Sequence, residues 1–180
     1  HRWQNTDQYY LSLSSWGKYE NTLSDDSAKT TISSGFASAV YNNEKGFNLE
    51  SGIRFNQHSR FGNNMTYTIN PSYIIAEKFK VAFNLSSAFT APTLYQLYDG
   101  YSGNRALNPE TAVSSEVSLQ YIGNKQFNAR ITGFARKLRN GIDYDYINNS
   151  YFNNAIQKDR GLELEAGYAS GKWNIKFNHT

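Results

Sequence analysis

The chain has 180 residues, no cysteine, a net charge of +3 and a mean hydropathy of −0.66. A sequence without cysteine excludes a disulfide framework and any thiolate metal site, and scattered charges without a basic block argue against a nucleic-acid partner. No stretch approaches the ~18 apolar residues of a membrane helix. Membrane β-strands, however, turn half of their side chains away from lipid, so their mean hydropathy can be that of a polar sequence.

Nine segments alternate apolar and polar side chains, which predicts β-strands with one face against an apolar medium. In chain order they are 8–18, 31–42, 47–55, 65–75, 81–89, 113–121, 127–145, 162–168 and 173–177. A change of parity near Phe134 predicts a bulge. Pro71 lies inside the fourth segment and cannot donate to a ladder, so we expect a bulge or a missing ladder bond there.

The connections between these segments alternate between two kinds. Tight turns are expected at 42–46, 77–79, 123–125 and 170–172, and longer or more polar loops at 19–30, 58–64, 90–111 and 146–151. Short turns on one rim and longer loops on the other are typical of outer-membrane barrels. We therefore predict an all-β, antiparallel, up-and-down transmembrane β-barrel wall. A soluble sandwich shares the alternation and remains the alternative.

The loop after the fifth segment carries a distinctive string, SSAFTAPTLYQLYDGYSGNRALNPE, at 86–110. Pro92 forces Ala91 into an extended conformation and ends the ladder. Leu94 and Leu97 provide a small apolar cluster for the loop, and Glu110 is placed to bond backbone donors as the next strand begins. We expect these motif residues to be mainly structural: Phe89, Ala91, Pro92, Leu94, Leu97, Leu107, Pro109 and Glu110.

This string resembles the signature stretch of TonB-dependent outer-membrane receptors, in which Phe-x-Ala-Pro is followed by a Leu-rich turn, Gly-Asn and Asn-x-x-Leu-x-Pro-Glu. The resemblance implies about nine strands of a 22-stranded barrel in the outer membrane of a Gram-negative bacterium. Residues 1–180 would then lie entirely in the barrel domain, with the N-terminal plug absent from this chain. The implied partners are outer-membrane lipid, a small-molecule nutrient and, through the plug, the TonB–ExbB–ExbD energising complex.

The resemblance favours cobalamin or a related corrinoid as the nutrient, because the Leu-Tyr-Gln-Leu-Tyr motif and the hairpin with IDYD and YFNN are most similar to cobalamin transporters. A ferric siderophore is the alternative within the family. Candidate ligand contacts in the outer loops are Tyr95, Tyr98, Tyr101, Asn104, Tyr144 and Tyr146. A structural role at a membrane interface is an equal alternative for each of them. No His lies between Phe89 and Glu110, which disfavours haem ligation by this loop.

Other functions find less support in the sequence. No phosphate loop or metal-ligand spacing is present, so we expect no enzyme activity and no resident cofactor. Asp25 and Asp26 could help to hold Ca²⁺ in the first outer loop, but no further acids lie nearby, so we expect a solvated turn. His58 is expected to be an ordinary surface His. A small eight-stranded barrel with an adhesive or structural role and a soluble all-β binding module are the alternatives from other classes.

Overall fold

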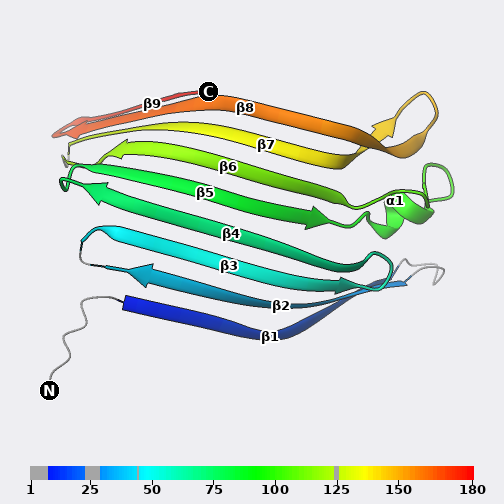
Figure 1. The fold of residues 1–180 in the computed structure, drawn as a ribbon. Helices are drawn as coiled ribbons and strands as arrows, with labels where there is room; N and C mark the ends of the chain where they lie inside the picture. Colours follow the sequence, from blue (N-terminus) through cyan, green and yellow to red (C-terminus); the bar gives the residue numbers. More distant parts are fainter. Residues whose placement is uncertain (1–7, 23–28, 44, 124–125) are drawn as a thin grey trace, which may run out of the picture.

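The computed structural model describes residues 8–22, 29–43, 45–123 and 126–180. These residues form one antiparallel sheet of nine strands that lie side by side in chain order (Figure 1). The strands are β1 (Gln8–Thr22), β2 (Lys29–Asn42), β3 (Phe47–His58), β4 (Gly62–Ile75), β5 (Phe79–Thr90), β6 (Glu110–Tyr121), β7 (Phe127–Asp145), β8 (Ser150–Ser170) and β9 (Trp173–His179). A short helix, α1 (Leu94–Tyr98), lies between β5 and β6.

The predicted alternation of the connections between two rims is confirmed, but their lengths do not alternate throughout, since β3–β4 and β4–β5 are joined by equally short turns. The connections after β2, β4, β6 and β8 lie at one rim, and those after β3, β5 and β7 lie at the other (Figure 1). The predicted loop at 58–64 is wrong in length, because β3 continues to His58 and β4 begins at Gly62. β8 begins twelve residues before the predicted strand at 162–168 (162 − 150 = 12), so β7 and β8 extend far past the other strands on the loop side.

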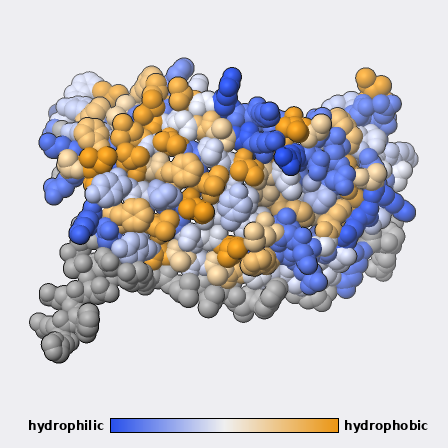
Figure 2. Space-filling model, viewed as in Figure 1, coloured by the Kyte–Doolittle hydropathy of each residue, from blue (hydrophilic) through white to orange (hydrophobic). Residues whose placement is uncertain are grey.

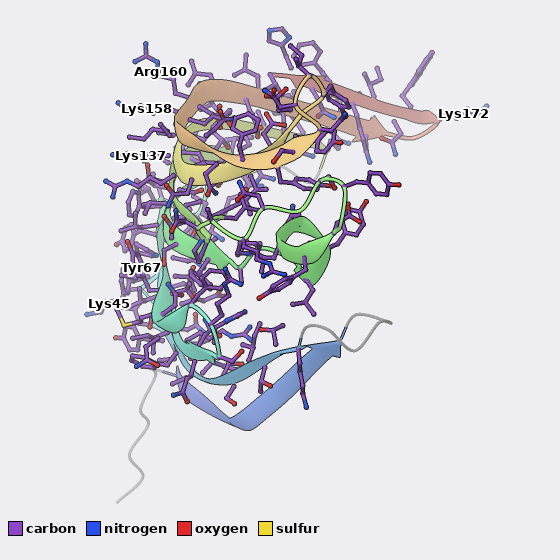
Figure 3. All side chains as sticks on the ribbon, turned by 90° about the vertical axis from the view of Figure 1, so that its right-hand side faces the viewer. Lys45, Tyr67, Lys137, Lys158, Arg160 and Lys172 are labelled. Atoms are coloured by element: carbon purple, nitrogen blue, oxygen red, sulfur yellow. The ribbon has the colours of Figure 1, made fainter. Side chains whose placement is uncertain are left out.

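On the outward face, apolar side chains of neighbouring strands lie directly opposite each other in the strand register. The aligned pairs include Phe55 with Met65, Ile69 with Leu85, Val81 with Leu119, Leu119 with Ile131, and Ile131 with Leu164. All of these except Leu85 are exposed, and they form an apolar band across the outward face (Figure 2). A sandwich would cover this band with a second sheet, and the described residues form a single curved layer (Figure 3). The structure therefore confirms the barrel wall.

The opposite face is concave and polar, and α1 lies on that side (Figure 3). Arg130 and Glu165 pair across β7 and β8 on this face, with 3.0 Å between Nη2 and Oε2. Asn70 and Asn84 bond to each other between β4 and β5. These polar side chains suit a watery lumen. No helix of the described residues is both long and apolar enough to cross a membrane.

The predicted bulge near Phe134 is wrong. β7 keeps one register across this position with both β6 and β8. The parity seemed to change because Phe134 is an aromatic residue on the concave face, where its ring covers Gly161. A Cβ at Gly161 would come within 2.7 Å of the ring. The missing side chain of Gly161 thus makes room for an inward-facing aromatic.

Pro71 interrupts the ladder as expected. It aligns with Leu49 of β3, but the pairing of β4 with β5 stops after Ile69 and resumes at Ser72. The register is the same on both sides of the gap, so the missing ladder contacts occur without a bulge. A register shift does occur in β1, between Ser14 and Gly17.

Candidate functional site

The site begins with α1, which sequence reasoning missed. Thr93 caps the helix: its Oγ1 accepts from the Gln96 N–H (3.1 Å), and Gln96 Oε1 accepts from the Thr93 N–H (2.9 Å). This is a capping box, in which two orphan donors are satisfied reciprocally. The Thr-x-x-Gln spacing directly after Pro92 is the signal that could have predicted the helix.

The loop that contains α1 has its own apolar core. Leu94, Leu97 and Leu107 are only 4%, 2% and 3% exposed, and they are the buried apolar side chains of the described residues. The expected cluster of Leu94 and Leu97 is thus present, and Leu107 completes it. Because the cluster lies beside the sheet rather than within it, it fixes the loop without contributing to the strand ladder.

The turn after α1 is held by Asp99 and Gly103. The Asp99 carboxylate accepts from Ser102 Oγ (2.7 Å) and from the N–H groups of Ser102 and Tyr101. These bonds, chiefly the one from the Ser102 hydroxyl, lower the pKa of Asp99. A Cβ on Gly103 would come within 2.5 Å of the Asp99 backbone. Gly103 is therefore required here by close backbone approach.

This loop is tied to the β7–β8 hairpin by hydrogen bonds. Ser102 accepts from the Tyr151 N–H (3.1 Å), and Asn104 Nδ2 donates to the Tyr151 carbonyl (2.8 Å). Asn153 Oδ1 accepts from the Asn108 N–H (2.8 Å), and its Nδ2 donates to the Asn108 carbonyl (3.0 Å). Two regions about 45 residues apart in the sequence thus form one surface at the loop rim.

Four tyrosines gather on that surface. Tyr144 and Tyr151 are direct cross-strand partners whose ring centroids are 5.0 Å apart. Tyr146 meets Tyr144 edge-on at 5.0 Å, and Tyr95 of α1 meets Tyr151 edge-on at 6.2 Å. Tyr144 and Tyr151 have the lumen-facing parity of Arg130 and Glu165. We call Tyr95, Tyr144, Tyr146 and Tyr151 the aromatic cluster.

The structure separates the six candidate ligand contacts. Tyr95, Tyr144 and Tyr146 belong to the aromatic cluster, and Tyr151 is the member that sequence reasoning missed, although it lies in the YFNN hairpin. Tyr101 is 95% exposed and lies outside the cluster. Asn104 holds the loop: its Nδ2 donates to Tyr151, and its Oδ1 accepts from the Ala106 N–H (2.8 Å).

Tyr98 lies between two guanidinium groups. The Arg60 and Arg105 guanidinium carbons are 5.5 and 5.2 Å from its ring centroid. Arg60 also donates to the Tyr98 hydroxyl and to the Arg105 carbonyl. Tyr98 therefore joins the β3–β4 turn to the α1 loop, and its ring faces are occupied by cations.

The expected backbone contact of Glu110 is present. Glu110 Oε1 accepts from the Ile142 N–H at 2.6 Å. This donor lies just after Asn140, whose positive φ of 54° bends β7. Asn140 Nδ2 in turn donates to the Pro109 carbonyl (3.4 Å). The end of the motif thus fixes the start of β6 against the bend in β7.

The remaining motif residues line the path of the chain into this loop. Phe89 pairs with Thr111 near the end of β5, Ala91 follows the last strand residue, and Pro92 is buried just before the helix cap. The ladder ends at Thr90, as the Pro92 argument requires. That these motif residues are mainly structural stays a prediction.

His58 is not the surface residue that we expected, since it is 4% exposed. Its Nδ1 accepts from the N–H groups of Arg60 (3.1 Å) and Phe61 (3.3 Å), and its Nε2 lies 3.1 Å from Thr30 Oγ1. The accepting Nδ1 assigns the ring to the neutral Nε2–H tautomer, which donates to Thr30. With both nitrogens occupied, His58 builds the β3–β4 turn.

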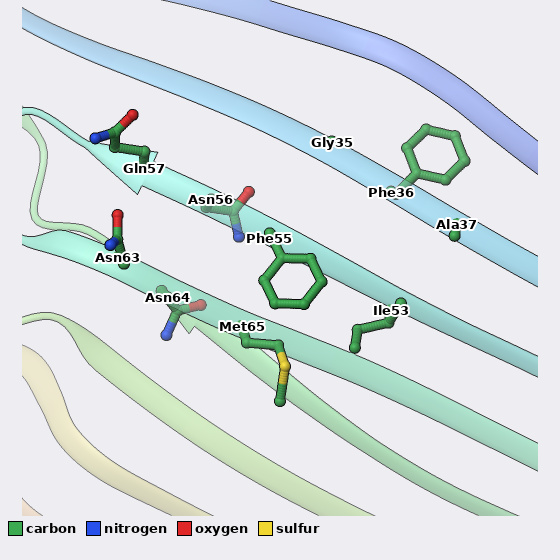
Figure 4. Close-up of a pocket in the computed structure, with 10 residues that line it drawn as sticks. All are labelled: Gly35, Phe36, Ala37, Ile53, Phe55, Asn56, Gln57, Asn63, Asn64 and Met65. Carbon is green, nitrogen blue, oxygen red and sulfur yellow. The ribbon is translucent and has the colours of Figure 1, made fainter.

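A hollow of about 880 Å³ lies away from the aromatic cluster. It forms on the outward face where Gly35 leaves room beside Ile53, Phe55 and Met65 (Figure 4). Its apolar lining on the band suits lipid chains rather than a polar nutrient. Asp25 and Asp26, the expected Ca²⁺ candidates, lie outside the described residues.

Comparisons with known proteins were made for the whole chain. The family model described as TonB dependent receptor-like, beta-barrel matches residues 1–180. The vitamin B12 transporter BtuB of Vibrio cholerae serotype O1 is 41% identical over 88 residues, covering 47% of this chain and 14% of that protein.

Solved structures share the fold. The siderophore receptor PirA from Pseudomonas aeruginosa superposes with a TM-score of 0.77 at 24% identity, covering 96% of this chain and 36% of that one. The ferric enterobactin receptor PfeA in complex with BCV-L6 gives a TM-score of 0.75 at 20% identity, covering 98% and 34%. The chain thus spans only a minor part of these relatives. The family match and the outward apolar band agree, and the chain belongs to the TonB-dependent receptor-like β-barrel family, whose members are outer-membrane receptors of Gram-negative bacteria.

Proposed function

We propose that this chain forms part of the wall and the outer mouth of a TonB-dependent active transporter that takes up a corrinoid. The observation that carries the proposal is the aromatic cluster, which is held rigidly at the loop rim by hydrogen bonds between the α1 loop and the β7–β8 hairpin. Aromatic rings provide large contact areas at low conformational cost. A rigid set of them at the mouth of a lumen suits the first capture of a bulky nutrient.

The charges near the cluster favour a corrinoid over a ferric catecholate. Asp99 lies in the loop that carries Tyr95, whereas Asp143 and Asp145 of the β7–β8 hairpin have the outward parity. Two cations at the same rim, Arg60 and Arg105, face Tyr98 instead. A ferric tris-catecholate is an anion and would be repelled by the Asp99 carboxylate, whereas cyanocobalamin is neutral. The identity to a vitamin B12 transporter over 88 residues supports the same choice.

A ferric siderophore is the second candidate, favoured by the resemblance of the fold to siderophore receptors. The small eight-stranded barrel and the soluble binding module have no comparable support, since the outward face is apolar across consecutive strands and the barrel family matches the whole chain. Within the transporter proposal, the chain performs no covalent chemistry. Energy would enter through the plug and the TonB–ExbB–ExbD complex.

The test is equilibrium binding of cyanocobalamin and a panel of ferric siderophores to the full-length receptor. Cyanocobalamin is expected to bind, and Tyr146→Ala should weaken binding about tenfold because one stacking aromatic is lost. Tyr101→Ala is the matched control, since this exposed tyrosine lies outside the cluster. Binding of a siderophore but no corrinoid would contradict the proposed nutrient and leave the proposed transport function standing. Binding of neither class would overturn the transporter proposal.

A further inference from the structure

Four cations gather on the outward face of the extended strands β7 and β8. They are Lys137, Arg139, Lys158 and Arg160. Lys137 and Lys158 are direct cross-strand partners, and Arg160 is opposite Ala135. By parity they continue the outward row that includes Ile131, Leu162 and Leu164. In Figure 3, Lys137, Lys158 and Arg160 all point away from α1 and the concave face. We call these four residues the basic patch.

The basic patch is not neutralised within the described part of the chain. Like charges directly opposite each other on a sheet are destabilising, yet Lys137 faces Lys158. The ion pair on these strands, Arg130–Glu165, lies on the concave face. The Asp159 position also lies on the concave face, opposite Arg136. An anion from outside the chain would therefore remove an existing repulsion.

Two carboxylates, Asp143 and Asp145, share the outward parity at this end of the hairpin. Asp145 is bonded to Ile147 and Asn148 in the turn at the tip. Asp143 lies four residues beyond Arg139, about 13 Å along an extended strand. Its Oδ2 accepts from Asn154 Nδ2 (3.3 Å), and Asn154 is opposite Gly141. Asp143 is thus held toward the tip of the hairpin, away from Lys158 and Arg160. The basic patch keeps its positive potential on the membrane side.

The patch lies at the height of lipid headgroups. Along β8 from the apolar band toward the loop rim, Arg160 lies two residues beyond Leu162, which is about 7 Å along the strand, and Lys158 lies about 7 Å further. Ile156, beyond Lys158, is again an exposed apolar side chain of the outward row. Both lie toward the loop rim, which faces the cell exterior in outer-membrane barrels. Figure 2 shows the corresponding hydrophilic area directly beside the apolar band. On β6, the outward neighbour of Lys137 is the apolar Val113.

We propose that the basic patch binds the phosphate groups of lipopolysaccharide in the outer leaflet. This inference rests on the assigned place of the barrel in the outer membrane and is independent of the nutrient. Two arginines offer forked donors to phosphate oxygens, and two lysines add mobile point charges. Opposite residues on paired strands are about 5 Å apart, so one phosphate can contact cations from both strands. The lipid acyl chains then lie along the adjacent apolar band.

The experiment compares the full-length receptor in nanodiscs that contain lipopolysaccharide or its enzymatically dephosphorylated form, with bound glycolipid counted by native mass spectrometry. Wild type should retain the phosphorylated form, and Lys158→Gln/Arg160→Gln should reduce its retention about tenfold. Lys45→Gln/Lys78→Gln, which removes two charges at the opposite rim, is the matched control and should behave as wild type.

Two results would overturn the proposal. One is equal retention of both glycolipid forms by the wild type, and the other is unchanged retention by the basic-patch variant. Heat-modifiable electrophoretic mobility verifies that each variant is folded. Cyanocobalamin binding, measured in parallel, separates the two proposals: the basic-patch variant should bind the nutrient as wild type does, whatever the outcome of the nutrient test itself.

Discussion

Substituting Leu97 by Ala should release the α1 loop without unfolding the wall. The Leu97 side chain is 2% exposed and packs in the small cluster with Leu94 and Leu107. Removing a fully buried Leu side chain costs about 2–5 kcal/mol, through lost transfer energy and the cavity left behind. From this range we take about 3 kcal/mol as the loss of docking energy. That corresponds to a roughly 100-fold higher population of the open loop.

Hydrogen–deuterium exchange of the loop amides measures this opening. The Asp99 N–H donates to the Tyr95 carbonyl (3.0 Å) and the Gly103 N–H to the Asp99 carbonyl (2.9 Å), so both should be protected in the docked loop. Leu97→Ala should accelerate their exchange roughly 100-fold, whereas Leu97→Met, which conserves volume, should change it little. Unchanged exchange in the Ala variant would refute the claim that the cluster holds the loop. The melting temperature of the barrel should be the same in both variants.

Three further predictions concern the wall, the motif and pH. Val117→Arg places a charge on the lipid face and should reduce the free energy of unfolding in bilayers by about 2–4 kcal/mol. Ser118→Arg places the same charge on the lumen face and should change this free energy little. Equal effects of the two substitutions would contradict the assigned faces. Glu110→Ala leaves the Ile142 N–H without its acceptor and should speed exchange of that amide about tenfold; an unchanged rate would show that the bond is dispensable. Protonation of His58 on lowering the pH from 7.5 to 5 would turn its accepting Nδ1 into a donor. The protection factors of its two backbone donors, which correct exchange for the intrinsic pH dependence, should therefore fall in the wild type and not in His58→Asn; pH-independent protection factors would exclude this reasoning.

Much of the wall was predictable because barrel strands repeat one physical rule. The alternation in segments such as 81–89 and 113–121 follows directly from lipid on one side and water on the other. The same rule misled at Phe134, because an inward aromatic packed over Gly161 looks like a change of parity. The sequence of one strand does not show that its neighbour across the sheet has no side chain, as is the case at Gly161.

The loop was predictable only in its local features. The burial of Leu94 and Leu97 and the contact of Glu110 with a backbone donor follow from residue type and position. The helix was missed although Thr93 and Gln96 carry its capping signal. The joining of Tyr95 to Tyr151 could not be read from the sequence, because it depends on the extra length of β7 and β8 beyond the other strands.

Site-directed spin labelling across β5 and β6 tests the central claim most directly. Residues 1–180 contain no cysteine, so each label is introduced here as a single cysteine. In the receptor reconstituted in bilayers, labels at 81, 83, 117 and 119 should be relaxed strongly by oxygen, which concentrates in lipid. Labels at 80, 84, 116 and 118 should be relaxed by a water-soluble nickel chelate. Accessibilities that fail to alternate, or oxygen exposure on the second set, would contradict the wall.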